Sequence, residues 1–572
     1  MNNTISTERK KRIFVTEEFV PEKWDTIEPY YQQLLNENFD DVDSFRNWLG
    51  KISELEAIIS ENAGWRYIQM TCDTTNKEYQ DAYTYFVSEI EPRIAPLNHQ
   101  LNEKIINCPY KKDLEDDAFK ILFRNIEKDF KIFREENIPL KTEIQNNSKE
   151  YGTISGAMTV TIDGKEMTLQ QAATILEFPD REKRENAYMH ISNRRFQEKG
   201  KLDELFNTLI SLRHKVAQNA DFENFRDYMF TAMGRFDYTP QDCFDFHEST
   251  QKAFVPILNQ LARERKEKLG VSQLKPWDKA VDPTSKPALV PFKDSSDLIE
   301  KTIECFNRLD PFLGKCIETM RDIKHLDLDS RIGKAPGGYN YPLSEIGIPF
   351  IFMNATSTLR DLVTILHEGG HAVHSVLTKN LELTDFKHTP SEVAELASMS
   401  MELISMDNWD IFFENEEDLK RAKREHLEQI IQTLPWVATI DKFQHWIYEN
   451  PRHSISDRTA KWNEVFDEFS DNVTDWTGLE KFRDYLWQKQ LHLYEVPFYY
   501  IEYGFAQLGA IAVWKRYKED PKKGLDGYLA ALKLGYTKSI PDIYNAANIE
   551  FNFSGEYISE LITFVSSELD KL

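Results

Sequence analysis

The chain has 572 residues, of which 41% are hydrophobic and 12% aromatic, and its formal net charge is -25. This composition supports a sizeable folded core and excludes global disorder, while the acidic balance argues against nucleic acid or an anionic membrane as a partner. The length favours two or more domains, or one large helical body with lobes.

Five cysteines are dispersed along the chain without a CxxC pair. Because their number is odd, a disulfide framework and a thiolate metal site are both disfavoured. Basic residues near the N-terminus are not followed by an apolar segment, and no run of 18 apolar residues occurs. We therefore expect no signal peptide, no membrane-spanning helix and a cytoplasmic location.

Helical patterns dominate the first part of the chain, in the segments 43–60, 74–91, 112–134 and 200–220. One of these segments places four apolar side chains on a single helix face: Tyr79, Tyr83, Phe86 and Ile90. Pro92 and Pro96 are expected to break or kink that helix. Residues 1–150 are therefore predicted to form an N-terminal helical lobe.

Two irregular regions interrupt the helices. Residues 157–168 alternate around Asp163-Gly164, which is typical of a β-hairpin with a primed turn. Thr168 and Gln171 then predict a capping box that opens the next helix. The glycine- and proline-rich second region contains an apolar stretch, 348–354, which predicts a strand.

A helix predicted over 359–377, with Thr358 and Asp361 as its N-cap pair, contains the sequence His367-Glu-Gly-Gly-His371. Two histidines four residues apart project from the same helix face, so both can bind one metal ion. Glu368 can then take a proton from a water on that metal. This motif predicts a zinc peptidase.

The two glycines inside this motif are unfavourable in a helix. Each costs about 1 kcal/mol relative to alanine in a helix interior. Their presence predicts that another segment of the chain packs tightly against the helix at this point.

A catalytic zinc site needs a third protein ligand and an open position for water. Leu377 stands where the HExxHxxGxxH pattern would place a histidine, which excludes that class, and His374 is interpreted as a packing or supporting residue. The helix predicted after residue 391 offers three glutamates on one face: Glu392, Glu395 and Glu402. Spacing alone does not choose among them, and a solvated acidic stripe is the alternative interpretation.

HEGGH followed by Pro390-Ser-Glu-Val-Ala-Glu-Leu-Ala-Ser resembles the thimet oligopeptidase and oligoendopeptidase F family of zinc peptidases, in its oligoendopeptidase F-like branch. The resemblance extends to Gly337-Gly338-Tyr339, to the 350–354 strand, to Thr358-Leu359 and to the Asp163-Gly164 hairpin. It covers roughly residues 150–560, while the first 150 residues match only in helical character.

The resemblance implies a mainly α, two-lobed peptidase with a deep central channel, a small β element beside the zinc-binding helix, and residues 151–572 as the catalytic region. It implies one Zn²⁺ per chain, bound by His367, His371 and Glu395, with Glu368 as the general base. Glu402 is expected to accept a hydrogen bond from a ligand histidine, with a plain surface charge as the alternative.

Residues 492–505 are rich in aromatic side chains, and Pro497 suits the first turn of a helix. An aromatic core face is one interpretation, and stabilisation of a developing oxyanion by a hydroxyl or imidazole is the other. Similarity to the tyrosine-rich block of the family implies catalytic roles for His492, Tyr500 and Tyr503. Tyr499 is expected to contact substrate, and the choice between Tyr499 and Tyr500 at the transition state stays open.

The expected function is zinc-dependent hydrolysis of internal bonds in short unfolded peptides. The alternatives are a helical zinc carboxypeptidase and a non-catalytic peptide-binding relative, although the intact Glu368 argues against the latter. Strand 348–354 is expected to pair with substrate as an edge strand, and Gly337, Gly338 and Tyr339 to bind it. Short peptides are the expected partners, with no nucleic acid, membrane or obligate protein partner.

Overall fold

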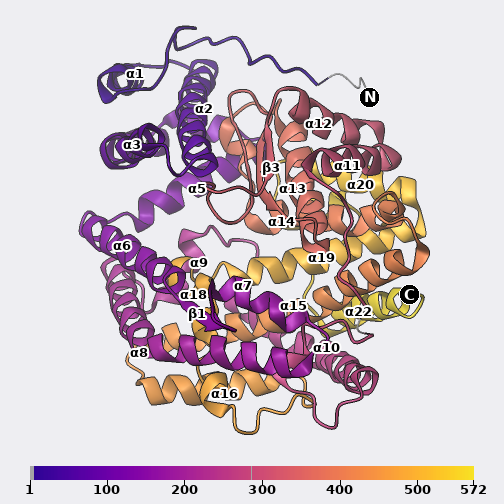
Figure 1. Ribbon diagram of the computed structural model, residues 1–572. Coiled ribbons are helices and arrows are strands. Elements are labelled where there is room, and N and C mark those ends of the chain that lie inside the picture. Colours follow the sequence, from indigo (N-terminus) through magenta and orange to yellow (C-terminus); the bar gives the residue numbers. More distant parts are fainter. Residues whose placement is uncertain (1–4, 285) are drawn as a thin grey trace.

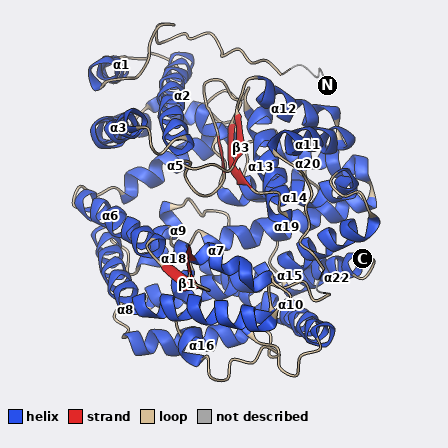
Figure 2. Ribbon diagram, viewed as in Figure 1, coloured by secondary structure: helices blue, strands red, loops and turns tan. Residues whose placement is uncertain are grey.

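The computed structural model describes residues 5–284 and 286–572, and helices make up most of its regular structure (Figures 1 and 2). The N-terminal part consists of α1 (Trp24–Asn36), α2 (Val42–Cys72), α3 (Lys77–Tyr85), α4 (Glu91–Ile106) and α5 (Asp117–Ile132). These helices enclose their own hydrophobic cluster, which runs from Val15 to Phe123 and also includes Leu383 and Phe386. The predicted all-helical character of this part of the chain is confirmed.

The predicted helix over 74–91 does not stop at the prolines. A short π-helical segment, Phe86–Ile90, joins α3 to α4, so that Pro92 lies in the first turn of α4 and Pro96 within it. The Glu91 N–H donates to the Phe86 carbonyl, so helical hydrogen bonding continues from the π-helical segment into α4. Phe86 and Ile90 are buried as the periodicity predicts.

The middle of the chain consists of α6 (Asn137–Gly156), α7 (Leu169–Ala173), α8 (Arg181–Asn219), α9 (Phe225–Ala232), α10 (Pro240–Leu269), α11 (Ser295–Leu309) and α12 (Pro311–Asp322). Between α6 and α7 lies the predicted hairpin, β1 (Thr159–Ile162) with β2 (Lys165–Thr168). Asp163 and Gly164 both have positive φ, as a primed turn requires, and the predicted Thr168 capping box is present.

A three-stranded sheet stands beside the motif helix in the order β3 (Leu326–Asp329), β5 (Phe350–Ala355), β4 (Tyr339–Tyr341). β5 pairs in parallel with β3 and antiparallel with β4. The predicted strand therefore exists, but it is central, and the expectation that it is an edge strand open to substrate is wrong. Among the described strands of this sheet, β4 is the edge strand that directly follows Gly337 and Gly338.

The remaining helices are α13 (Leu359–Thr378), α14 (Ser391–Ser405), α15 (Glu416–Glu449), α16 (Ile455–Phe469), α17 (Glu480–Arg483), α18 (Leu491–Glu495), α19 (Tyr500–Glu519), α20 (Pro521–Leu532), α21 (Ile540–Ala546) and α22 (Gly555–Leu569). Figure 1 shows α13, α14 and α19 packed together near the centre of the molecule. The large hydrophobic cluster begins at Ile132 and surrounds these helices.

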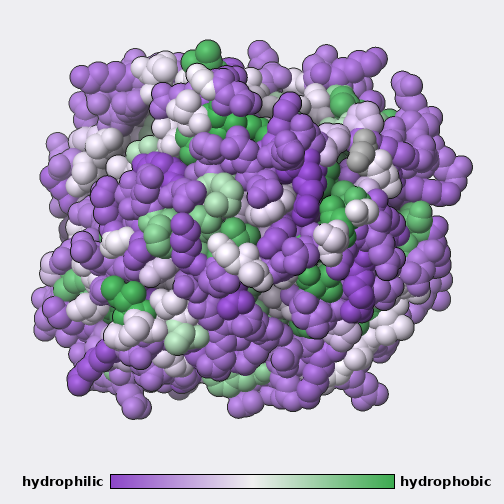
Figure 3. Space-filling view, turned by 60° about the horizontal axis from the view of Figure 1, so that its bottom comes forward, coloured by the Kyte–Doolittle hydropathy of each residue, from purple (hydrophilic) through white to green (hydrophobic). Residues whose placement is uncertain are grey.

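Along the sequence, the boundary between the two main clusters therefore falls between Phe123 and Ile132. The predicted division at residue 150 falls inside α6. The division into an N-terminal lobe and a catalytic region stays a prediction. No helix among the described residues is long and apolar enough to cross a membrane. On the face in Figure 3 hydrophilic residues predominate and hydrophobic patches are small, so no broad apolar surface is exposed there.

Candidate metal centre and active site

The motif helix α13 begins at a reciprocal cap. Thr358 accepts a hydrogen bond from the Asp361 N–H, and the Asp361 carboxylate accepts one from the Thr358 N–H at 3.0 Å. This pairing satisfies two backbone donors that the first turn would otherwise leave free. The helix is buried along most of its length, while the side chains of His367 and His371 remain partly accessible.

The two motif glycines bring other helices against α13. A Cβ atom at Gly370 would lie 2.6 Å from the Cα of Ser398 and 2.7 Å from the Ala397 carbonyl oxygen. A Cβ atom at Gly369 would lie 2.7 Å from the ring of Phe306. The predicted close approach of another segment is therefore present, and at Gly370 that segment is the backbone of α14.

This approach places Glu395 of α14 opposite the two histidines. Its Oε2 atom lies 3.4 Å from Nε2 of His367 and 4.0 Å from Nε2 of His371. The three atoms lie within 4.8 Å of one another, so a single ion between them can contact all three. The Glu395 side chain is otherwise held by the Ser398 hydroxyl, which donates at 3.3 Å.

Glu402, two turns after Glu395, lies on the far side of the His367 ring. Its Oε1 atom is 2.6 Å from Nδ1 of His367. Because a carboxylate accepts, Nδ1 carries a proton, and in the neutral ring the lone pair of Nε2 points at Glu395. A lone pair and a carboxylate oxygen 3.4 Å apart repel each other unless a cation or a proton lies between them.

The other candidates for a third ligand point elsewhere. Glu392 is buried and accepts a hydrogen bond from the Tyr238 hydroxyl at 2.6 Å. His374 is also buried, and it is absent from the group of ligand atoms around His367. The structure therefore brings Glu395, and neither of these residues, to the motif histidines.

The donor set fits a catalytic zinc ion. Two imidazoles and one carboxylate are a common protein ligand set for such an ion, which keeps a further position for water. A second group, Cys243, Asp441 and His445, also has ligand atoms within 4.8 Å, but it is fully buried. There Gln444 and His247 hydrogen-bond to the Asp441 carboxylate, and the His445 ring lies 3.2 Å from it.

Glu368 directly follows His367 in the motif and is itself buried. Burial raises the pKa of its carboxyl to about 7, although the neighbouring His367 opposes the shift. The Asn340 side chain donates to the Glu368 carbonyl at 3.3 Å, which ties β4 to α13. A carboxyl poised in this range can both take and return a proton near neutral pH.

An aromatic wall comes from α18 and α19. The ring centroid of His492 lies 4.8 Å from that of Tyr500 and 5.9 Å from that of Tyr503, and the Tyr499 and Tyr503 centroids are 5.2 Å apart. Burial raises the pKa values of Tyr499 and Tyr503, and the charge of Glu395 adds to both shifts, so these two residues lie near Glu395.

Tyr500 faces a different group. Burial raises the pKa of its hydroxyl to about 12, and the neighbouring Gln490 and Trp436 side chains oppose that shift. The predicted residues of the aromatic block therefore gather into one cluster, within which Tyr499 and Tyr503 approach Glu395 while Tyr500 contacts the residues behind His492.

Residues 174–562 match the model of peptidase family M3, and residues 14–133 match the model of the peptidase M3 N-terminal domain. The chain belongs to peptidase family M3. The first 150 residues thus match the family by more than helical character, which extends the resemblance found in the sequence.

The relatives of this M3 peptidase support its placement in the oligoendopeptidase F-like branch. It is 25% identical over 560 residues to an oligoendopeptidase F homolog of Borreliella burgdorferi, covering 91% of this chain and 88% of the relative. It is 22% identical to an oligoendopeptidase F homolog of Lactococcus lactis, covering 71% and 67%. The solved structure of PZ peptidase A with inhibitor 2 is 28% identical, with a TM-score of 0.88 over 97% of this chain and 99% of that one. The mainly α fold predicted from the sequence is confirmed.

Residues that sequence reasoning missed hold the aromatic wall of the peptidase in place. Phe498, just before α19, has a φ of 69°, which is strained for a bulky side chain. Its carbonyl accepts from Arg235, and its N–H donates to the Gln444 side chain at 2.7 Å. Arg235 also pairs with Glu502 at 2.8 Å in a fully buried contact. Only tertiary contacts reveal these residues, since nothing in their local sequence marks them.

The glycine-rich segment Gly337-Gly338-Tyr339 contacts β5 and α2. Gly337 has a φ of 99°, and its carbonyl accepts from Asn354 at 2.9 Å. A Cβ atom at Gly338 would lie 3.3 Å from the Phe352 carbonyl oxygen. The Tyr339 hydroxyl contacts Thr71 of α2 at 2.6 Å. Its side chain is therefore engaged by the N-terminal part, and only its backbone stands at the edge of the sheet.

Proposed function

We propose that this family M3 peptidase is a zinc-dependent oligoendopeptidase that hydrolyses internal bonds of short unfolded peptides in the cytoplasm. The observation that carries the proposal is the convergence of His367, His371 and Glu395 beside Glu368, with His492 and Tyr503 in the facing aromatic wall. The oligoendopeptidase F relatives support the same activity.

His367, His371 and Glu395 would hold the zinc ion. When bound, zinc lowers the pKa of a water molecule and polarises the scissile carbonyl. The hydrogen bond from His367 to Glu402 fixes the ring so that Nε2 faces the ion. Glu402 thus sets both the tautomer and the orientation of a ligand.

Glu368 is the general base in this proposal. Its carboxylate takes a proton from the attacking water and delivers it to the nitrogen of the leaving amine. The pKa of about 7 produced by burial suits both transfers. A water-activating carboxylate at this position has no purpose in a protein that only binds peptides, which disfavours the non-catalytic alternative.

The aromatic wall stabilises the developing oxyanion. Burial and the charge of Glu395 raise the pKa of Tyr503 well above its ordinary value, so its hydroxyl keeps its proton and donates. Burial lowers the pKa of His492, which leaves its imidazole neutral. One such donor, aimed at the site of charge development, contributes about 3 to 4 kcal/mol.

The direct test is mass spectrometry of products from a mixed peptide library, with and without a chelator. Internal cleavage that the chelator abolishes and zinc restores is the expected result. Release of single C-terminal residues alone would establish the carboxypeptidase alternative. A peptide with an amidated C-terminus adds a second criterion, because an endopeptidase still cleaves it.

A further inference from the structure

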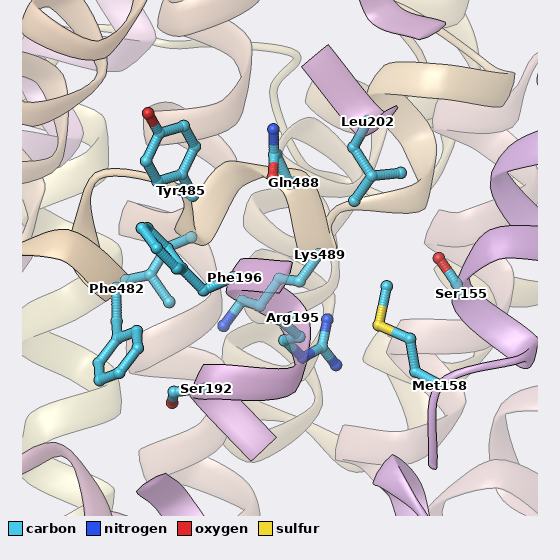
Figure 4. A pocket seen from close by; sticks show the side chains of 11 residues that line it. Ser155, Met158, Ser192, Arg195, Phe196, Leu202, Phe482, Tyr485, Gln488 and Lys489 are labelled. Carbon is cyan, nitrogen blue, oxygen red and sulfur yellow. The ribbon is translucent and has the colours of Figure 1, made fainter. Parts of the chain in front are cut away.

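Two cations line a small cavity outside the catalytic group. Arg195 of α8 and Lys489, just before α18, border a space of about 50 Å³ together with Ser155, Ser192 and Tyr485. Figure 4 shows both cationic side chains near the centre of this cavity, with the two serines on opposite sides. A water molecule needs about 10 to 15 Å³ of such space, so a carboxylate with its remaining hydration fits.

Neither cation has a charge partner. Among the described residues no carboxylate forms an ion pair with Arg195 or Lys489, although neighbouring arginines of α8 are paired. Arg194 contacts Glu198 at 2.8 Å, and Arg184 contacts Asp278 at 2.8 Å. Both unpaired side chains are exposed to solvent. An anion that enters the cavity therefore finds two positive charges that the protein has left unneutralised.

The pKa values of Lys489 and Arg195 reflect the lack of a neighbouring anion. The surrounding protein and the positive charges of Arg195 and Lys279 lower the pKa of its ammonium to about 8. Burial likewise lowers the pKa of the Arg195 guanidinium. Two cations held together without an anion destabilise each other, and a bound carboxylate removes that repulsion.

A chain of contacts links this cavity to the aromatic wall. The Lys489 ammonium lies 4.9 Å from the ring centre of Trp436. Trp436 donates to Gln490 at 3.0 Å, and Gln490 contacts His492 at 2.7 Å. A larger cavity of about 500 Å³ is lined by both Tyr500 and Lys489. Open space thus extends from Tyr500 to Lys489, which also lines the smaller cavity beside Arg195.

We propose that Arg195 and Lys489 bind a carboxylate of the peptide substrate, foremost its free C-terminal carboxylate. An ammonium and a guanidinium supply several charge-assisted donors, which a carboxylate can accept in pairs. Because Lys489 is linked to His492 through Trp436 and Gln490, this contact favours peptides whose C-terminus lies a few residues beyond the cleaved bond. The inference rests on the proposed peptidase activity and extends it to the choice of substrate.

The test compares matched fluorogenic peptides that differ only at the terminus, one with a free acid and one with an amide. A second pair exchanges Asp for Asn near an amidated terminus, because a side-chain carboxylate is the other source of the same chemistry. For the zinc-loaded wild-type enzyme at pH 7 and low salt, kcat/KM for the acid is expected to exceed that for the amide about tenfold, as one charged hydrogen bond predicts.

Lys489→Gln and Arg195→Gln are each expected to bring the acid-to-amide ratio close to one, and Lys489→Glu to invert it. Lys183→Gln is the matched control, because it removes one exposed charge from α8 away from the cavity and should keep the wild-type ratio. A ratio above one only for the Asp and Asn pair would support the site with a side-chain carboxylate as its ligand.

A wild-type ratio near one for both peptide pairs would overturn the inference. So would an unchanged ratio in Lys489→Gln, which removes an exposed charge and so carries little folding risk. Failure of the underlying function looks different, since it would abolish chelator-sensitive cleavage of every peptide, acid and amide alike.

Discussion

Gln490 fixes the ring of His492 through a hydrogen bond of 2.7 Å between its Nε2 atom and Nδ1 of the imidazole. The orientation of the amide follows from Trp436, whose indole N–H can only donate and contacts Gln490 Oε1 at 3.0 Å. The amide nitrogen must therefore donate to Nδ1. Because His492 is neutral, its one proton lies on Nε2, where it is free to donate.

Gln490→Met should therefore lower kcat by about tenfold, equivalent to about 1.4 kcal/mol, with a smaller change in KM. The substitution keeps the volume but removes the group that selects the tautomer. In the Gln490→Met background, His492→Phe should cost less than it does in the wild type, which a double-mutant cycle measures. Additive losses from the two substitutions would show that Gln490 does not act through His492.

Glu368→Gln should retain zinc and lose turnover. Gln preserves the shape of the side chain but cannot take a proton, and a positioned general base contributes roughly 100- to 10,000-fold to the rate. Metal content by mass spectrometry and kcat on one fluorogenic peptide measure the two effects separately. Near-normal turnover in a zinc-loaded variant would contradict the assignment of Glu368 as the base.

Glu395→Ala should release the metal, because it removes the one carboxylate that faces both motif histidines. Glu392→Gln is the matched control on the same helix, since it keeps an acceptor for Tyr238 and should retain zinc. Equilibrium dialysis against a zinc buffer measures both variants. Full occupancy in Glu395→Ala together with loss in Glu392→Gln would reverse the assignment.

Gly370→Ala should weaken both folding and zinc binding. The added methyl group meets the backbone of α14 at 2.6 Å, and overpacking of this kind costs about 1 to 3 kcal/mol. Gly200→Ala in α8 is the control, because nothing lies within 4 Å of its Cβ position and the helix gains about 0.5 to 1 kcal/mol. Thermal unfolding should therefore move to lower temperature in the first variant and not in the second, and equal shifts would remove the packing argument.

The sequence predicts what depends on local geometry. The spacing of His367 and His371, the cap at Thr358 and the turn at Asp163-Gly164 each follow from a few neighbouring residues, and the structure contains all of them. The choice of Glu395 over its neighbours depends on where α14 crosses α13. Spacing alone left that choice open, and only the resemblance to known peptidases indicated it.

Non-local contacts account for what the sequence did not predict. β5 is central because β3 and β4 pair with its two edges, and neither pairing is encoded within the strand itself. The strained Phe498 is held by Arg235 and Gln444, which come from separate elements. That no described carboxylate pairs with Arg195 or Lys489 follows only from the three-dimensional arrangement of the side chains around them.

The preference for a free carboxylate should depend on pH through Lys489. The protein around its ammonium, with the charges of Arg195 and Lys279, lowers its pKa to about 8, while Asp471 pairs with Lys279 at 2.8 Å. Well below pH 8 the ammonium is charged and the preference is complete, and as pH rises through about 8 the charge and the preference decline together. Because kcat/KM reports the free enzyme, the acid-to-amide ratio should titrate near that value, while pH effects on the catalytic groups cancel between the two peptides. The same titration of Lys489→Gln should be flat, and an inflection that persists near pH 8 in this variant would assign the pH dependence to another group.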